Sequence, residues 1–347
     1  MASLPKPVPE DGSVLAVVIN YNGGDTVLRC LDSLKSQDYP NLKVIVVDNA
    51  STDGSAAKIA TAHPEARLIL TGVNGGWGIG CNIGMAAADS EFIALVNNDA
   101  WLDPACISEM VKGLRLKKEY GSCASKILTA EGNRLEVCGL HIVADGSSCG
   151  RGRLREITLF SEADEVFCAN DCVCLYKREM INDIGDYDPD FFIYCDETDM
   201  GFKHQLAGWR CIYNPKALAY HAHSLTAGSY SAFKAFHVER NRILILFKYF
   251  PLWWILWGTA LSCWRYLLWV WMARRRKHGA LAKYLEGNSM GAGFKVLVRA
   301  HFSALRLAPR MFSRRFALKR IRRIDSAGFQ NLFRQYGISI RAMAEYE

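Results

Sequence analysis

The sequence has few cysteines and few charged residues for its length. Its 347 residues include 12 cysteines, and no two of them have the CxxC spacing of a zinc or redox site. Charged residues make up 22% of the chain, whereas 50% of it is hydrophobic. This composition excludes a disordered chain, a collagen-like repeat and a small disulfide-stapled domain. We therefore expect a folded protein with free thiols in a reducing compartment.

The sequence also shows no secretory signal and neither of two common nucleotide-binding motifs. Residues 1–13, MASLPKPVPEDGS, contain no apolar stretch, so we expect no secretory signal. The chain has no Walker A motif, and the glycines of residues 72–84 do not have the GxGxxG spacing of a dinucleotide site. Neither an NAD-dependent nor an ATP-hydrolysing enzyme is therefore expected.

Basic residues are concentrated near the C-terminus. Residues 273–347 contain 17 Lys and Arg against 4 Asp and Glu, whereas the rest of the chain has 25 against 31. Before them, residues 243–272 are mostly apolar and contain six tryptophans. Indole-rich apolar sequence followed by basic residues is typical of a membrane–water interface. It suits a solvated nucleic-acid groove poorly, so we expect no nucleic-acid partner.

The apolar segment is interrupted by charge. A membrane span needs about 20 apolar residues, but the longest uncharged run, residues 249–264, has 16 and lies between Lys248 and Arg265. We expect a helical hairpin that lies in or re-enters the cytoplasmic leaflet. The alternatives are a true membrane span and a buried helix pair or oligomer interface.

The protein is expected in the cytoplasm, associated peripherally or monotopically with the inner face of the cell membrane. The expected domains are a catalytic domain at 1–240 and a basic, Trp-rich helical region at 241–347.

The first hundred residues alternate between strand and helix patterns. The apolar runs that predict strands are 14–19, 43–47, 67–70 and 92–96. The helical patterns that follow the first three are 25–36, 55–62 and 81–88. Repeated β-α-β units predict an α/β fold with a twisted, mostly parallel sheet flanked by helices. Ligands of such sheets bind beyond the carboxyl ends of the strands.

Polar residues follow three of these strands. They are Asn20-Tyr21-Asn22, Asp48-Asn49 and Asn97-Asn98-Asp99. Asp99 and Asn97 offer the hard oxygen ligands that suit Mg²⁺ or Mn²⁺ on a diphosphate.

A second polar cluster lies about a hundred residues further on. Asp196, Glu197 and Asp199 crowd three carboxylates into four positions. Their mutual repulsion raises the pKa of at least one of them towards the range of a general base. The same residues also suit the N-terminus of the helix predicted to run to about Ala207. His221 and His223 lie on a later extended segment, and we expect at most one of them to face the cleft.

These segments together resemble the inverting GT-A glycosyltransferases of glycosyltransferase family 2. The resemblance is strongest to the rhamnosyltransferase-like branch of bacterial surface-polysaccharide synthesis. The matching segments follow the family's order and are VVINYN (17–22), VIVVDNASTDGS (44–55), NGGWGIGCNIG (74–84), ALVNNDAWLDP (94–104), IGDYDPDFFIYCDETDMGFKHQLAGWR (184–210) and PKALAYHAHS (215–224).

The resemblance implies roles for individual residues. Those expected to bind the nucleotide are Tyr21, Asn22, Asp48, Asn82 and Asn98. Those expected to hold Mg²⁺ or Mn²⁺ are Asp99 and His221, with His223 as second choice for the imidazole. The position of the family's general base corresponds to Glu197. Asp196 is the alternative, because the family's Glu-Asp pair has the reversed order Asp196-Glu197 in this sequence. The residues expected to anchor the acceptor helix are Asp199 and Trp209.

The resemblance also implies a reaction. A one-step displacement would move a sugar from a nucleotide-diphosphate donor, dTDP-rhamnose or a UDP-hexose, to a hydroxyl of a lipid-diphosphate-linked saccharide. The expected partners are the TDP- or UDP-sugar, the lipid-linked acceptor, the cytoplasmic membrane surface and a second copy of the chain. The alternatives are a sugar-nucleotide nucleotidyltransferase and a non-catalytic, membrane-bound scaffold with the same fold.

Overall fold

The chain forms two compact units. The computed structural model describes residues 8–222, 231–276 and 280–346. The first unit comprises residues 1–140 and 150–226, and the second comprises 141–149 and 227–347. The first helix of the second unit, α7, runs from Ala232 to Tyr249. It passes through the expected boundary between residues 240 and 241, so the units divide earlier in the chain than the predicted domains.

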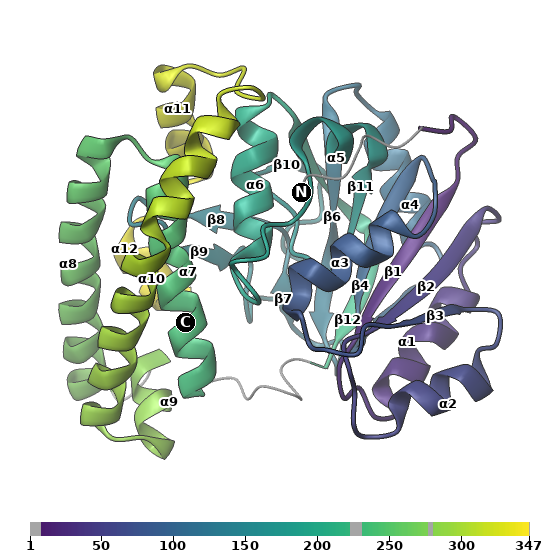
Figure 1. Ribbon diagram of the computed structural model, residues 1–347, viewed down its shortest axis with the longest axis horizontal. Helices are drawn as coiled ribbons and strands as arrows, with labels where there is room; N and C mark the ends of the chain where they lie inside the picture. The colour runs from purple at the N-terminus through teal and green to yellow at the C-terminus, as the bar shows by residue number, and fades with distance from the viewer. Residues whose placement is uncertain (1–7, 223–230, 277–279, 347) are drawn as a thin grey trace. The chain divides into compact units, whose positions relative to one another are not determined.

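The elements follow one another from the first unit into the second (Figure 1). The strands are β1 (Val14–Asn20), β2 (Leu42–Asp48), β3 (Arg67–Leu70), β4 (Phe92–Asn97), β5 (Ala100–Leu102), β6 (Tyr120–Thr129), β7 (Leu135–Val137), β8 (Leu140–Ile142), β9 (Ser148–Gly150), β10 (Asp164–Val166), β11 (Val173–Lys177) and β12 (Arg210–His221). The helices are α1 (Thr26–Lys35), α2 (Ser55–Ala62), α3 (Gly76–Ala86), α4 (Cys106–Arg115), α5 (Arg178–Ile184), α6 (Asp196–Leu206), α7, α8 (Leu252–Arg276), α9 (Ala280–Gly287), α10 (Met290–Leu318), α11 (Ser326–Tyr336) and α12 (Ile340–Tyr346).

A ten-stranded sheet forms the core of the first unit. Its main path has the order β10-β12-β6-β11-β4-β1-β2-β3, with β5 on β12 and β7 on β6. The strands β1, β2, β3 and β4 pair in parallel, as do β6 and β12, whereas β11 is antiparallel to both of its neighbours. All seven residues of β1 are buried, because this central strand is covered on both faces. The predicted α/β class, with a mostly parallel sheet flanked by helices, is confirmed.

The glycine-rich segment is more helical than expected. The sequence predicts a loop followed by a helix at 81–88, but α3 begins at Gly76. A Cβ atom on Gly84 would lie 2.2 Å from Val17 Cγ1, and one on Gly80 would lie 3.1 Å from Ile19 Cγ2. The glycines therefore allow α3 to pack directly on β1, which explains a helix of such poor intrinsic propensity.

The second unit is helical and includes a short segment from the middle of the chain. The elements α7 and α8 form a helix pair with Pro251 between them. Residues 243–246 of α7, which form the first half of the expected membrane hairpin, are buried, so this half packs inside the protein and, of the two halves, only α8 exposes large apolar side chains. Residues 141–149 belong to this unit, and Ile142 bridges Gly337 while Val143 packs with Ile340 and Met343. Within residues 8–222, 231–276 and 280–346, no helix has the length and hydropathy that a bilayer span requires.

Candidate active site

A buried amide at the end of β1 joins the ends of three parallel strands. Asn20 Nδ2 donates to Asp48 Oδ2 (2.7 Å) and to Ser55 Oγ (2.9 Å), and its Oδ1 accepts from Asn98 Nδ2 (3.0 Å). The other oxygen of Asp48, Oδ1, accepts from the Ser51 amide (2.9 Å). Both Asn20 and Asp48 are buried. The expected nucleotide residues Asp48 and Asn98 are thus brought together through Asn20.

The loop after β1 leaves an aromatic ring exposed beside this cluster. Asn22, with φ of 50°, accepts from the Thr52 amide through Oδ1 (2.8 Å) and donates from its own amide to Ser51 Oγ (2.9 Å). These bonds fasten the β1 loop to the β2 loop. Tyr21 between them is 38% exposed. An exposed phenol ring at this edge can stack on a planar ligand group.

The expected metal residues meet at one imidazole. His221 Nε2 lies 3.0 Å from Asp99 Oδ1, and His221 Nδ1 lies 2.7 Å from Glu136 Oε1. The pairing of β12 with β5 creates this contact, because it aligns His221 with Ala100. His223, the second choice, lies outside the described residues. Among those described, no group of three or more His, Cys, Asp or Glu side chains has a metal-binding arrangement.

Three neighbouring groups determine the charge of His221. Burial alone would lower the pKa of His221, but Cys172, Asp99 and Glu136 outweigh it and raise the pKa well above its usual range. The Asp99 carboxylate is a hard oxygen ligand of the kind that suits Mn²⁺, and His221 could add a nitrogen ligand if the cation displaces the Nε2 proton. A divalent cation commonly completes its coordination with substrate phosphate and water. Asp99 and His221 therefore fit a cation held jointly by protein and diphosphate.

The segment before α6 has a strained backbone. Phe192, Tyr194 and Cys195 have φ angles of 65°, 66° and 60°. This left-handed region is rare for residues other than glycine and occurs where the surroundings enforce it, often at functional sites. Cys195 is the residue that immediately precedes α6. The strain thus determines the direction in which the first turn of α6 carries Asp196 and Glu197.

The three carboxylates of α6 have different surroundings. Asp196 is 3% exposed, and its Oδ1 has no hydrogen-bond partner within the described parts of the chain. Burial, together with Glu197, raises the pKa of Asp196 well above its usual range. Asp199 is also buried, but its Oδ2 lies 3.3 Å from Lys203 Nζ. Glu197 is half-buried. Burial and the repulsion of Glu197 thus act together on Asp196, whereas Asp199 is paired with Lys203.

The start of α3 connects the strand ends to this acidic turn. Asn49, next to Asp48, donates from Nδ2 to Gly76 O (3.0 Å), and the Trp77 amide donates to Phe192 O (2.7 Å). A Cβ atom on Gly78 would lie 3.6 Å from Asp196 Oδ1. Hydrogen bonds thus lead from Asn49, at the end of β2, to the start of α3, and from there to Phe192 in the segment before α6. The end of β2 is therefore linked through α3 to the segment that precedes Asp196 and Glu197.

Two expected site residues have structural partners. Both polar groups of the Asn82 side chain bond the Tyr187 peptide, since Nδ2 donates to its oxygen and Oδ1 accepts from its amide, each at 2.9 Å. This side chain therefore fastens α3 to the segment before α6, and its expected contact with the nucleotide stays a prediction. Trp209 is 9% exposed and donates from Nε1 to Asp183 Oδ2 (2.7 Å), which anchors the turn after α6 to α5.

Three residues were not assigned a role from the sequence. Asn20 could have been suspected, since it is the first polar residue after an apolar strand. Glu136 and Asp171 gave no signal, because neither belongs to a motif. Asp171 accepts from Tyr187 Oη (2.8 Å) and Trp77 Nε1 (3.3 Å), and burial raises the pKa of its carboxyl. It fixes the two segments that flank Asp196.

Comparison with known sequences supports the interpretation that the chain is an enzyme that transfers sugars. The family described as "Glycosyl transferase family 2" matches residues 15–185. An N-acetylglucosaminyl-diphospho-decaprenol L-rhamnosyltransferase of Mycobacterium tuberculosis is 25% identical over 251 residues, which cover 64% of this chain and 80% of the relative. The succinoglycan biosynthesis protein ExoO of Rhizobium meliloti is 29% identical over 162 residues, 46% of this chain and 40% of that protein.

Solved structures share the fold. A mannosyltransferase of Pyrobaculum calidifontis, solved with GDP-Man and Mn²⁺, matches with a TM-score of 0.53 at 19% identity, over 92% of this chain and 88% of that chain. TarS 1–349 of S. aureus, solved with UDP-GlcNAc, matches with a TM-score of 0.52 at 15% identity, over 94% and 92%. Residues 15–185 are a domain of glycosyl transferase family 2, and the chain is a glycosyltransferase with a GT-A fold.

Proposed function

We propose that the protein transfers a sugar, with inversion, from a nucleotide-diphosphate donor to a saccharide hydroxyl on a lipid diphosphate. The observation that carries the proposal is the link from Asp48 and its neighbour Asn49, through Gly76 and Trp77, to the segment immediately before α6. It joins a site for a nucleobase to carboxylates that can accept a proton. An inverting transfer needs both at once, since base and leaving group act on opposite faces of the sugar.

The donor end of the site is the edge formed by β1, β2 and β4. Asp48 presents a carboxylate held by Asn20 and Ser51, and Tyr21 exposes its ring beside it. A fixed carboxylate can accept the N3–H of a pyrimidine while the ring stacks on the base. Uracil and thymine both carry this N–H, so we propose a TDP- or UDP-sugar. The similarity to the mycobacterial L-rhamnosyltransferase favours rhamnose as the sugar and a polyprenol diphosphate as the carrier.

The base is Glu197. Asp196 is almost completely buried and its raised pKa favours the protonated form, whereas Glu197 is half-buried on the same turn. A base must reach the acceptor hydroxyl and be ionised before attack. Glu197 meets the first condition better, because it is half-buried and its longer side chain extends further from the helix. Asp199, paired with Lys203, holds the turn in place.

The leaving diphosphate is held at Asp99 and His221. A divalent cation bound between them would offset the charge that develops on the leaving group. Glu136 orients the imidazole by its contact with Nδ1, so that Nε2 points towards Asp99. Such a carboxylate–imidazole pair behind a metal ligand fixes the ring and its tautomer. Mn²⁺ or Mg²⁺ fits this pair, and the Mn²⁺ in the archaeal mannosyltransferase structure supports the choice.

A donor panel tests the proposal. The purified chain is incubated with Mn²⁺, a synthetic GlcNAc-diphospho-polyprenol and, in turn, dTDP-rhamnose, UDP-galactose, UDP-GlcNAc and GDP-mannose. We expect nucleoside diphosphate release with one pyrimidine donor, matched by an elongated lipid product of inverted anomeric configuration in NMR. Product formed only from GDP-mannose, or with retained configuration, would contradict the proposal.

A further inference from the structure

The long helix α8 buries Ser262 and Arg265 and exposes seven large apolar side chains. Its inner face carries Gly258, Ser262 and Arg265, and both Ser262 and Arg265 are buried. Arg265 is the charge that interrupts the apolar segment in the sequence. Because it points inward, it does not interrupt the outer surface of the helix.

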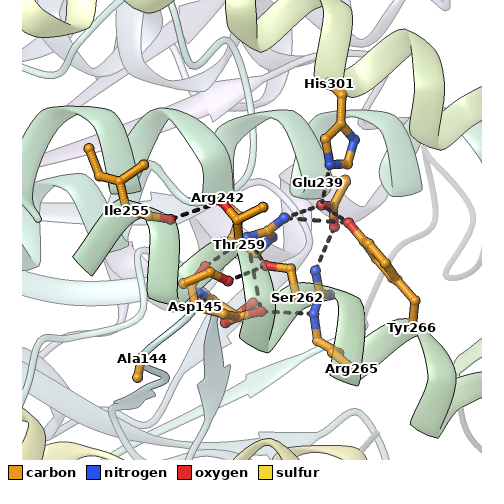
Figure 2. A network of polar contacts seen from close by, with 12 residues as sticks. Ala144, Asp145, Glu239, Arg242, Ile255, Thr259, Ser262, Arg265, Tyr266 and His301 are labelled. Atoms are coloured by element: carbon orange, nitrogen blue, oxygen red, sulfur yellow. Dashed lines mark hydrogen bonds and ion pairs between the residues drawn. The ribbon is translucent and has the colours of Figure 1, made fainter. Parts of the chain in front are cut away.

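A buried ion network explains how the inner face is stabilised (Figure 2). Arg265 Nε lies 2.9 Å from Asp145 Oδ2, and its Nη2 donates to Glu239 Oε2 (2.8 Å). Arg242 donates from Nη1 to Ser262 Oγ (2.8 Å) and to Asp145 O (2.7 Å), and it pairs with Glu239 through Nη2. Burial alone would raise the pKa of Glu239, but the two guanidinium groups hold it well below its usual range. The charges thus compensate one another within the second unit.

The outer face of α8 is a continuous apolar stripe. Its large exposed side chains, with their exposed fractions, are Leu252 (67%), Trp253 (60%), Leu256 (78%), Trp257 (56%), Trp264 (56%), Leu267 (66%) and Trp271 (48%). Together they span about 30 Å of helix at 1.5 Å per residue. The next exposed residues are Arg274 and Arg275. A stripe of this size on a monomer indicates an interaction surface.

The helix α10 repeats this pattern with basic flanks. Its exposed apolar side chains Phe294, Val298, Phe302 and Leu305 recur every three or four residues, so they lie on one face. Exposed basic residues border them, and these are Lys295, Arg299, Arg306 and Arg310. Neither α8 nor α10 contains an Asp or Glu. Apolar rows bordered by arginine, without acidic residues, are typical of helices that lie in the plane of a membrane interface.

We infer that α8 and α10 bind an anionic lipid surface, with their exposed apolar rows inserted at the headgroup level. A second copy of this chain would present the same basic, acid-free helices and would be repelled. An anionic lipid surface complements both the apolar rows and the arginines. The indoles of α8 suit the headgroup region, where an apolar ring and an N–H donor are both accommodated. The inference rests on the second unit alone and is independent of the donor.

Vesicle binding tests this inference with the full chain and without any acceptor. The probes are phosphatidylcholine vesicles and vesicles of phosphatidylcholine with 30% phosphatidylglycerol, and binding is followed by co-sedimentation and by quenching of Trp fluorescence with brominated lipid. We expect at least tenfold tighter binding to the anionic vesicles, with quenching. We also expect binding to weaken in about 0.5 M salt, because salt screens the arginines. Equal, salt-independent binding to both vesicles would contradict the electrostatic part of the inference.

Two serine variants locate the lipid face. The double variant Leu256→Ser/Leu267→Ser should bind anionic vesicles at least tenfold more weakly. Leu116→Ser is the matched control, since Leu116 is 67% exposed on the other unit, and it should bind within twofold of the wild type. The inference is overturned if the double variant binds vesicles normally. It is equally overturned if the chain is a dimer in light scattering that the double variant dissociates, since α8 would then be a subunit interface. Circular dichroism confirms that both variants are folded.

Discussion

His221 Nε2 lies 3.0 Å from Asp99 Oδ1, although the two residues are 122 positions apart in the sequence. Backbone pairing maintains the contact, because the Ala222 amide donates to Asp99 O (2.9 Å) and β12 pairs with β5. The strand that carries the imidazole is thus joined to the loop that carries the carboxylate. This arrangement brings the two proposed cation ligands together near the end of β4, where the diphosphate of the donor is proposed to bind.

Asp99→Ala should weaken nucleotide binding only when a divalent cation is present. The variant removes one of the two proposed protein ligands, so calorimetry with UDP or TDP should show at least a tenfold loss of affinity in Mn²⁺. In EDTA the affinity should equal that of the wild type. Asp32→Ala, on the exposed side of α1, is the control and should bind normally in both buffers. An equal loss in Mn²⁺ and in EDTA would show that Asp99 binds the nucleotide without a cation.

Glu136→Gln should raise the Mn²⁺ concentration needed for activity. Glu136 touches the imidazole rather than the proposed substrate, and loss of such a partner typically costs about 10- to 100-fold in metal affinity. We expect the Mn²⁺ titration, followed by nucleotide binding, to shift by that factor, with turnover at saturating Mn²⁺ reduced less. A loss of turnover that saturating Mn²⁺ does not recover would contradict this positioning role.

Asp196→Asn should increase stability. Asp196 is buried and its pKa is raised, so the folded state must either bury a charge or take up a proton. The amide avoids this cost, which we place at about 1–3 kcal/mol. Below the unfolded pKa of about 3.9, both states are protonated and the difference between variant and wild type should vanish. It should grow as the pH rises above that value. Thermal unfolding from pH 3.5 to pH 8 measures it, and a variant less stable at pH 8 would contradict the argument.

Arg265→Met should destabilise the second unit severely. It leaves Asp145 and Glu239 with an uncompensated buried charge, and removing one partner of a buried pair costs about 3–5 kcal/mol. Arg274→Met, an exposed change on the same helix, should alter the free energy of unfolding by less than about 0.5 kcal/mol. Urea unfolding followed by Trp fluorescence compares them. Equal stability of the two variants would show that the network does not hold α8.

The sequence predicts the sheet better than it predicts the site. The four strands of the first hundred residues lie within one residue of their expected ends, since apolar runs bounded by turns leave little choice. The glycine-rich helix was predicted to start too late, because helix propensity does not include the close approach of α3 to β1. Asp48 and Asp99 could be proposed from the sequence, because Asp48 ends a strand and Asp99 lies just after one.

Other features depend on contacts that no local pattern records. Glu136 reaches His221 across 85 residues, and Asn82 was assigned to the nucleotide although a peptide occupies both of its polar groups. The left-handed run before α6 has no glycine to signal it. In the sequence, Arg265 interrupts the apolar segment of α8. In the structure it points inward, towards Asp145 and Glu239, so the opposite face of the helix stays apolar.

The role of Glu197 is tested most directly by single-turnover transfer with Glu197→Gln. The wild type and the variant are mixed with the donor that the panel identifies, the lipid-linked acceptor and Mn²⁺, and nucleoside diphosphate release is timed. We predict that the variant binds the nucleotide with unchanged affinity and transfers at least a thousandfold more slowly, since a neutral amide cannot take the acceptor proton. Transfer by Glu197→Gln at close to the wild-type rate would contradict the assignment of the base.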